Sequence, residues 1–254
     1  MQYARLGNSG LAVSRLAFGV MTFGSATGPN DPMAHVWKTP QGEADALVGR
    51  ALDAGINFFD AADAYAGGQS EVFLGKALGA RRKDVLISTK VGFRSGPDLI
   101  HAGASFRYIV AATEASLRRL NTDYVDLLSM HKPDPYPPAE ESARALEYLV
   151  QRGMVRYLGY SNFSAWQAAK FVGIQKLHNY APLIAAQMYY SLMGRDLEHE
   201  IVPFCRDAGI GIVVWSPLAG GFLTGRYTRQ DQTGGKGRIA EPAFCLWIAR
   251  RATI

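Results

Sequence analysis

Asp60 and Tyr65 are the first pair of side chains in this sequence that can take part in proton transfer. They lie in the segment GINFFDAADAYAGGQSE, residues 55–71, where Asp60 ends an apolar run and Tyr65 lies in a loop before two glycines. A lone aspartate more often caps a turn, and a lone tyrosine more often packs in a core. The pair therefore indicates chemistry only if the fold brings other titratable side chains beside it.

An alternation of strands and helices can bring such side chains together. After an N-terminal hairpin at 3–13, strand-like apolar runs alternate with segments of helical periodicity. We expect strands at 15–21, 56–60, 85–90, 124–131, 155–161, 183–187 and 210–216, and helices at 43–54, 70–78, 105–120, 138–152, 165–172 and 196–209. Pro203 is expected to kink or break the last helix. Apolar strands that alternate with helices predict a parallel sheet covered by helices.

The strand ends distinguish a closed barrel from an open sheet. Six of the expected strands end on a polar residue, namely Asp60, Lys90, His131, Ser161, Gln187 and Ser216. A ring of polar groups at the C-terminal strand ends is typical of a barrel, whereas an open sheet binds its ligand at one switch point. No GxGxxG motif follows the first strand. The sequence therefore predicts an α/β protein, a (β/α)8 TIM barrel in one domain over residues 1–254.

In such a barrel, neighbouring strand ends bring Asp60, Tyr65, Lys90 and His131 together. An ammonium group beside a phenol lowers the phenol pKa from about 10, so Lys90 can make Tyr65 a usable acid. Asp60 would compensate the charge of Lys90, and His131 would donate a hydrogen bond to a substrate oxygen. This set suits the reduction of a carbonyl to an alcohol. Two other interpretations stay open, namely Lys90 as a Schiff-base lysine and His131 as a satisfied core histidine.

Further motifs follow residues 55–71 in order, and they carry a family resemblance. They read ISTKVGF, SMHKPDP, GYSNFSAWQ, AAQMYYSL and VVWSPLAGGFLTGRY. Over residues 1–227 the chain resembles the aldo-keto reductases, and bacterial members in particular. The resemblance implies an α/β barrel that reduces aldehydes or ketones with NADPH. It also implies that Asp60, Tyr65, Lys90 and His131 form the catalytic tetrad, with Tyr65 as the acid.

The resemblance also implies which residues bind the cofactor, NADP. Ser161, Asn162 and Gln187 match the family residues that hold the nicotinamide carboxamide, and Trp215 matches the aromatic residue that stacks on the nicotinamide ring. The loop along the pyrophosphate corresponds to residues 216–220, in which the expected ligands are Ser216, Pro217, Leu218 and Gly220. These positions agree with the ring of polar strand ends.

The C-terminal residues depart from the family pattern. The family continues through two further helices and an eighth strand, after which a loop and helix hold the adenosine 2′-phosphate, whereas residues 217–254 do not resemble that segment. Only the run at 243–249 is a candidate eighth strand. We therefore expect a truncated member with an incomplete barrel, which is marginally stable or self-associates and binds NADPH weakly, with little preference over NADH. An incomplete pocket also predicts broad selectivity among small carbonyl substrates.

Composition argues against several other classes of protein. With 48% hydrophobic and 19% charged residues, the chain can bury a core and is not disordered. The net charge is +5, but the basic pairs are scattered, so no nucleic-acid partner is expected. No apolar run approaches the roughly 20 residues of a membrane span, which predicts a cytoplasmic protein without a membrane partner. Cys205 and Cys245 lack metal-ligand spacing, so no metal site is expected.

Two hypotheses compete with an active enzyme. The first is a non-catalytic, cofactor-binding or regulatory member of the same fold, because some aldo-keto reductases act as auxiliary subunits of channels. The second is an inactive, truncated remnant. Binding of NADPH and turnover of aldehydes separate the three interpretations.

Overall fold

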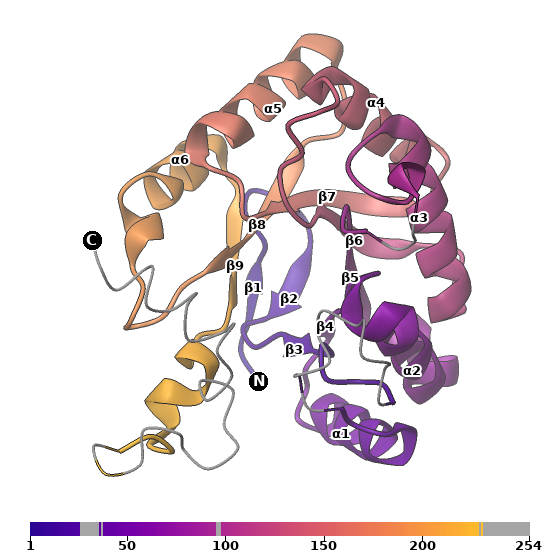
Figure 1. The fold of residues 1–254 in the computed structure, drawn as a ribbon, viewed down its shortest axis with the longest axis vertical. Helices are drawn as coiled ribbons and strands as arrows, with labels where there is room; N and C mark the ends of the chain where they lie inside the picture. Colours follow the sequence, from indigo (N-terminus) through magenta and orange to yellow (C-terminus); the bar gives the residue numbers. More distant parts are fainter. Residues whose placement is uncertain (26–35, 37, 95–97, 229, 231–254) are drawn as a thin grey trace.

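The computed structural model describes residues 1–25, 36, 38–94, 98–228 and 230. In these residues seven parallel strands form one sheet in the order β3-β4-β5-β6-β7-β8-β9. Its strands are β3 (Phe18–Gly19), β4 (Phe58–Asp60), β5 (Leu86–Val91), β6 (Val125–Met130), β7 (Val155–Ser161), β8 (Leu183–Tyr189) and β9 (Gly211–Trp215). The helices are α1 (Gln41–Asp53), α2 (Gln69–Leu78), α3 (Phe106–Leu120), α4 (Ala139–Gln151), α5 (Ala165–His178) and α6 (Ile201–Ala208). Figure 1 shows the sheet curling with these helices along its outer side, which confirms the predicted TIM-barrel type of α/β fold.

Each strand sends alternate side chains to the two faces of the sheet. On β5, Ile87 is fully buried in the outer core between the sheet and the helices. Phe59 of β4 and Leu128 of β6 belong to the same core. Lys90, three positions after Ile87, projects from the opposite face of β5 toward Asp60. The strand pattern therefore places apolar side chains outside and polar strand ends inside the barrel.

Helix limits follow from local sequence, as α3 shows. The helix begins after Ser105, whose Oγ accepts a hydrogen bond from the amide of Tyr108 at 3.3 Å. It ends at Asn121, which adopts the left-handed region with a φ of 53°. Ile109 and Leu120 are among its buried side chains, and the helix packs against β5. These signals lie in the sequence, so the predicted and observed limits of this helix differ by one residue.

A two-stranded antiparallel hairpin, β1 (Tyr3–Arg5) and β2 (Ala12–Ser14), covers the N-terminal ends of the barrel strands. Leu6, Leu11 and Val13 pack against residues at the starts of several strands, which include Phe58, Leu127 and Ile184. Gly7 makes the turn with a φ of +59°, and a Cβ atom there would lie 2.4 Å from the carbonyl oxygen of Gly209. Apolar packing closes this end, and the polar side chains lie at the opposite, C-terminal ends of the strands, here called the barrel mouth.

The structure departs from the predicted elements near Pro203. The single helix expected at 196–209 divides into a short 3-10 turn, Asp196–Glu198, and α6. Pro203 lies in the first turn of α6, where the missing amide breaks no helical hydrogen bond, so the helix continues without a kink. The helix expected at 165–172 extends to His178, because Gly173 does not end it. The run at 243–249, expected as an eighth strand, lies outside the described residues.

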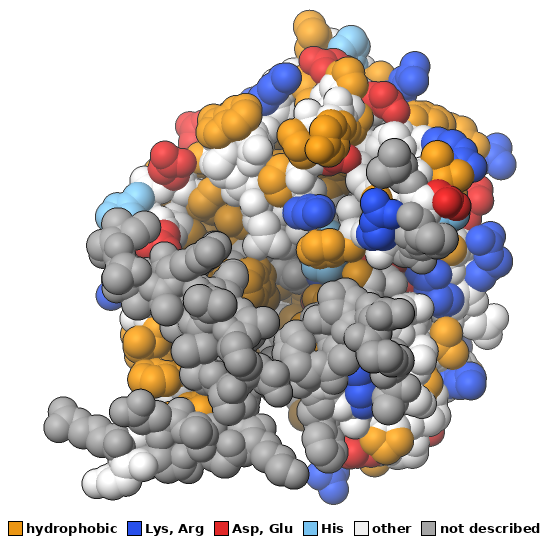
Figure 2. Space-filling view, in the orientation of Figure 1, with side chains coloured by type: hydrophobic (Ala, Val, Ile, Leu, Met, Phe, Trp, Pro, Cys, Tyr) orange, Lys and Arg blue, Asp and Glu red, His pale blue; other side chains and the backbone are white. Residues whose placement is uncertain are grey.

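Figure 2 shows one face of the molecule, on which Lys and Arg side chains are interspersed with acidic and hydrophobic ones. This mixture matches the scattered basic pairs in the sequence. Within the described residues, no helix combines the length and the apolar character that crossing a membrane requires.

Arg82 joins the N-terminal ends of β5 and β6 through four hydrogen bonds. Its guanidinium donates to Thr122 Oγ1 at 3.1 Å, to the carbonyl oxygens of Val85 and Tyr124 at 3.0 and 2.8 Å, and to Asp126 Oδ2 at 2.9 Å. It also lies 4.4 Å from the centroid of the Tyr124 ring. The planar guanidinium reaches all these partners at once, which a lysine ammonium cannot do.

We expect Arg82→Lys to lower the free energy of unfolding by about 2–3 kcal/mol, because several partly buried acceptors lose their donor. Urea denaturation, with the slope of the transition unchanged, measures the loss. Arg81→Lys is the matched control, since Arg81 is exposed, and it should change stability by less than about 0.5 kcal/mol. Equal stability of the two variants would show that the hydrogen bonds of Arg82 contribute nothing.

Candidate active site

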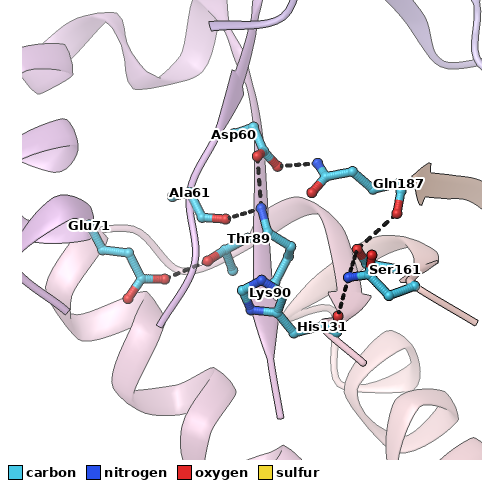
Figure 3. A network of polar contacts seen from close by, with 9 residues as sticks. Asp60, Ala61, Glu71, Thr89, Lys90, His131, Ser161 and Gln187 are labelled. Carbon is cyan, nitrogen blue, oxygen red and sulfur yellow. Dashed lines mark hydrogen bonds and ion pairs between the residues drawn. The ribbon is translucent and has the colours of Figure 1, made fainter. Parts of the chain in front are cut away.

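The barrel mouth carries a buried ion pair between β4 and β5. Lys90 Nζ donates to Asp60 Oδ2 at 2.7 Å and to the carbonyl oxygen of Ala61 at 2.7 Å. Gln187 Nε2, from β8, donates to the other carboxylate oxygen of Asp60 at 2.9 Å. Figure 3 shows Asp60 between Lys90 and Gln187, with the lysine projecting from β5. The expected contact between Asp60 and Lys90 is thus present, and it joins strands that are far apart in the sequence.

Tyr65 reaches the same place from the loop after β4. It begins a 3-10 turn, Tyr65–Gly68, in which Ala66, Gly67 and Gly68 all adopt the left-handed region, with φ values of 49°, 62° and 89°. The ring centroid of Tyr65 lies 5.0 Å from Lys90 Nζ and 5.8 Å from that of His131, in an edge-to-face arrangement. The four side chains expected to form the catalytic tetrad therefore meet at the barrel mouth.

Burial decides the protonation of the phenol and the ammonium. Burial raises the pKa of Tyr65, and the charge of Lys90, which lowers it, does not fully offset this effect. The predicted effect of Lys90, which is to lower the pKa of Tyr65, is present. The net pKa of Tyr65 is nevertheless above its usual value, because burial has the larger effect. Burial lowers the pKa of Lys90, but Asp60 and Tyr65 raise it by more. The pKa of Lys90 is therefore above its usual value. At neutral pH the phenol is protonated and the lysine is charged.

His131 is neutral at this site. Burial, followed by the charges of Lys90 and Lys132, lowers its pKa to about 2. The Phe93 ring lies edge-on against the imidazole, with 4.4 Å between centroids. No group among the described residues hydrogen-bonds to the buried Nδ1 of His131. The alternative of a satisfied core histidine therefore does not fit, and a neutral imidazole remains able to donate one hydrogen bond.

The side chains expected to hold a nicotinamide carboxamide lie beside this cluster. Ser161 Oγ donates to the carbonyl oxygen of Gln187 at 2.8 Å. Asn162 is left-handed with a φ of 62°, and its Nδ2 donates to Ser161 Oγ at 2.9 Å and to the carbonyl oxygen of His131 at 3.1 Å. The amide nitrogens of Asn162 and Gln187 donate to protein groups, and each of these side chains also carries an amide oxygen that can accept from a ligand. A carboxamide NH2 group fits these acceptors.

Trp215 and the loop after β9 complete the expected cofactor positions. Trp215 is half-buried, and its ring centroid lies 5.1 Å from that of Tyr189. After it, Ser216, Ala219 and Gly220 adopt the left-handed region with φ values of 53°, 49° and 66°. Pro217 and Leu218 are exposed. A partly exposed flat ring and a loop with repeated left-handed residues suit a nicotinamide ring and an anionic group, respectively.

Sequence reasoning missed the polar residues behind β5. Glu71 of α2 is fully buried and accepts hydrogen bonds from Thr89 Oγ1 at 2.5 Å and from Arg119 Nε at 2.7 Å. Asp63, in the loop before Tyr65, is also buried. A signal was present, since Glu71 lies within the segment at residues 55–71 and Thr89 precedes Lys90. The partner Arg119 lies on a distant helix, and only the fold brings it there.

A curled parallel sheet covered by helices, with polar side chains gathered at its mouth, defines an α/β barrel protein. The model of the Aldo/keto reductase family matches residues 15–242. The chain therefore belongs to the aldo/keto reductase family, whose members act on carbonyl groups and generally bind a nicotinamide cofactor.

Several relatives are similar to this chain over most of its length. A probable voltage-gated potassium channel subunit beta of Arabidopsis thaliana is 40% identical over 234 residues, which cover 90% of this chain and 67% of the relative. Aldo-keto reductase AMT2 of Alternaria alternata is 36% identical over 280 residues, which cover 98% of this chain and 75% of the relative. Versiconal hemiacetal acetate reductase of Aspergillus parasiticus is 36% identical over 243 residues, which cover 88% of this chain and 69% of the relative.

Proposed function

We propose that this protein is an NADPH-dependent reductase of aldehydes or ketones, with Tyr65 as the proton donor. The observation that carries the proposal is the convergence of four side chains at the barrel mouth, where Lys90 Nζ lies 2.7 Å from Asp60 Oδ2 and 5.0 Å from the Tyr65 ring centroid. Relatives that are named as reductases support the same reaction class. The proposed substrate is a small carbonyl compound, and the proposed location is the cytoplasm.

The four side chains have distinct roles in this proposal. Tyr65 gives its hydroxyl proton to the carbonyl oxygen, and Lys90 stabilises the resulting phenolate by its charge. Asp60 keeps Lys90 charged, and neutral His131 donates a hydrogen bond that orients the carbonyl. When bound, the nicotinamide supplies the hydride that the carbonyl carbon receives. Ser161, Asn162 and Gln187 would hold its carboxamide, and Trp215 would lie against its ring.

Binding and turnover test the proposal directly. Fluorescence titration with NADPH should show saturable binding, and a panel of small aldehydes should be reduced with loss of NADPH absorbance. NADH in place of NADPH measures whether the adenosine 2′-phosphate is recognised. A protein that binds neither cofactor and reduces no aldehyde would refute the proposed function.

A second candidate function is that of a cofactor-binding accessory subunit. The observation that favours it is the similarity to the probable voltage-gated potassium channel subunit beta of Arabidopsis thaliana. In that case NADPH would bind with ordinary affinity, but turnover would be negligible across the aldehyde panel. Binding together with turnover would favour the reductase.

A further inference from the structure

Glu71, Thr89 and Arg119 form a hydrogen-bonded group on the far side of β5 from Lys90, and we refer to these three residues together with nearby Asp63 as the rear cluster. Glu71 is fully buried and bonded to Thr89 and Arg119. Thr89 precedes Lys90 on β5, so the two side chains leave opposite faces of the strand, as Figure 3 shows. The rear cluster therefore contacts the same strand segment as the ion pair of Lys90 and Asp60.

Asp63 connects the rear cluster to the loop that carries Tyr65. Its amide donates to the carbonyl oxygen of Lys90 at 3.0 Å. The residue is 4% exposed, and no side chain of the described residues hydrogen-bonds to either carboxylate oxygen. Tyr65 follows two residues later. Asp63 is thus a buried acid without a side-chain donor, in the loop that carries the proposed proton donor.

The charges around Asp63 leave its carboxylate without a cation of its own. The groups that face it are Glu71 from α2, Arg119 from α3, Lys90 from β5, and Tyr65 from its own loop. Arg119 is paired with Glu71 at 2.7 Å, and Lys90 is paired with Asp60 at 2.7 Å. An ionised Asp63 therefore adds a third buried negative charge to two that are already compensated.

Burial and the neighbouring negative charge together hold the pKa of Asp63 above its usual value. Burial, followed by the charge of Glu71, raises its pKa to about 7, against the opposing effects of Arg119, the Ala64 amide and Lys90. The charge of Asp63 in turn raises the pKa of Tyr65. Protonated Asp63 leaves Tyr65 the stronger acid, and ionised Asp63 makes it a weaker one.

The loop that carries Tyr65 contacts Arg119 of the rear cluster. Gly68 ends the run of left-handed residues, and a Cβ atom there would lie 2.7 Å from both Cδ and Nε of Arg119. Left-handed backbone is unfavourable for Ala66, so the loop needs contacts that hold it in place. The close approach of Gly68 to Arg119 provides one such contact with the rear cluster.

We propose that Asp63 is a positioning residue for the proposed reduction: its amide ties the Tyr65 loop to β5, and its buried carboxylate, when ionised, weakens proton donation by Tyr65. The inference rests on the proposed function, because it assigns Tyr65 the role of proton donor. It adds a residue that touches neither substrate nor cofactor and acts through Tyr65.

The dependence of kcat/KM on pH tests this role. For the unchanged protein we expect kcat/KM for an aldehyde to fall about fivefold or more as the pH rises through about 7. Asp63→Asn removes the titrating group and keeps its shape, so its kcat/KM should stay within about threefold of the original at acid pH and lose the step near neutrality. Asp53→Asn, which alters an exposed aspartate at the end of α1, should keep the original profile.

Amide chemical shifts provide a readout that does not need turnover. In nuclear magnetic resonance spectra the amides of Tyr65 and Ala66 should titrate with a midpoint of about 7, and this titration should vanish in Asp63→Asn. If it occurs but no aldehyde is reduced, the proposed function fails while the coupling of Asp63 to the loop stands. If Asp63→Asn keeps the neutral step, or lowers activity equally at every pH, the positioning role is refuted.

Discussion

Tyr65→Phe is expected to lower kcat for aldehyde reduction by about 10²–10⁴-fold, the usual contribution of a general acid. The substitution removes only the hydroxyl, so the ring can keep its positions 5.0 Å from Lys90 Nζ and 5.8 Å from the His131 centroid. Stability and NADPH affinity should therefore change little. Steady-state kinetics with a reactive aldehyde, together with a thermal melt, separates loss of chemistry from loss of folding.

Tyr148→Phe is the matched control for this experiment. Tyr148 lies on α4 and is exposed, so loss of its hydroxyl should leave kcat unchanged. A Tyr65→Phe variant that keeps more than about a third of the original kcat would show that the proton comes from another group. A variant that melts at a much lower temperature would instead show a structural role for the hydroxyl.

Asp60→Asn is expected to lower the free energy of unfolding by about 3–5 kcal/mol at neutral pH, because it leaves the buried ammonium of Lys90 uncompensated. An asparagine oxygen can accept from Lys90 or from Gln187, whereas the carboxylate accepts from both, at 2.7 and 2.9 Å. Aldehyde reduction should also be lost. Urea denaturation and kinetics measure the two effects.

The pH dependence of stability gives the second part of this prediction. In the unchanged protein the pKa of Lys90 is raised, so the stability from its charge is fully present below the unfolded value of about 10.4 and is lost only as the pH rises through the folded value. Without Asp60, burial should lower the pKa of Lys90 below its unfolded value. The folded variant then binds fewer protons than the unfolded chain, and its stability should rise with pH until the pH reaches the unfolded value of about 10.4.

The exposed residue Asp84 offers a control for this series. Asp84→Asn should change stability by less than about 0.5 kcal/mol and should leave its pH dependence unaltered. If Asp60→Asn loses less than about 1 kcal/mol, or becomes no more stable at higher pH, then the ion pair with Lys90 does not support the fold as described.

The sequence alone determined the barrel and the positions of the proposed catalytic residues. Alternating apolar strands and helices predicted seven parallel strands, because a strand buried on both faces must be apolar through its length. The polar residues at the strand ends followed from the same pattern. Asp60, Lys90 and His131 could therefore be placed at one edge before any contact was known.

Only the tertiary structure decided how these side chains are charged and supported. Burial raises the Tyr65 pKa more than Lys90 lowers it, and burial is a sum over atoms from many strands that no local pattern reveals. Likewise, Asp63 and Glu71 look like ordinary loop and helix residues in the sequence. They become a buried acidic pair because α2 and α3 pack together and bring Arg119 to Glu71, a contact between residues 48 positions apart.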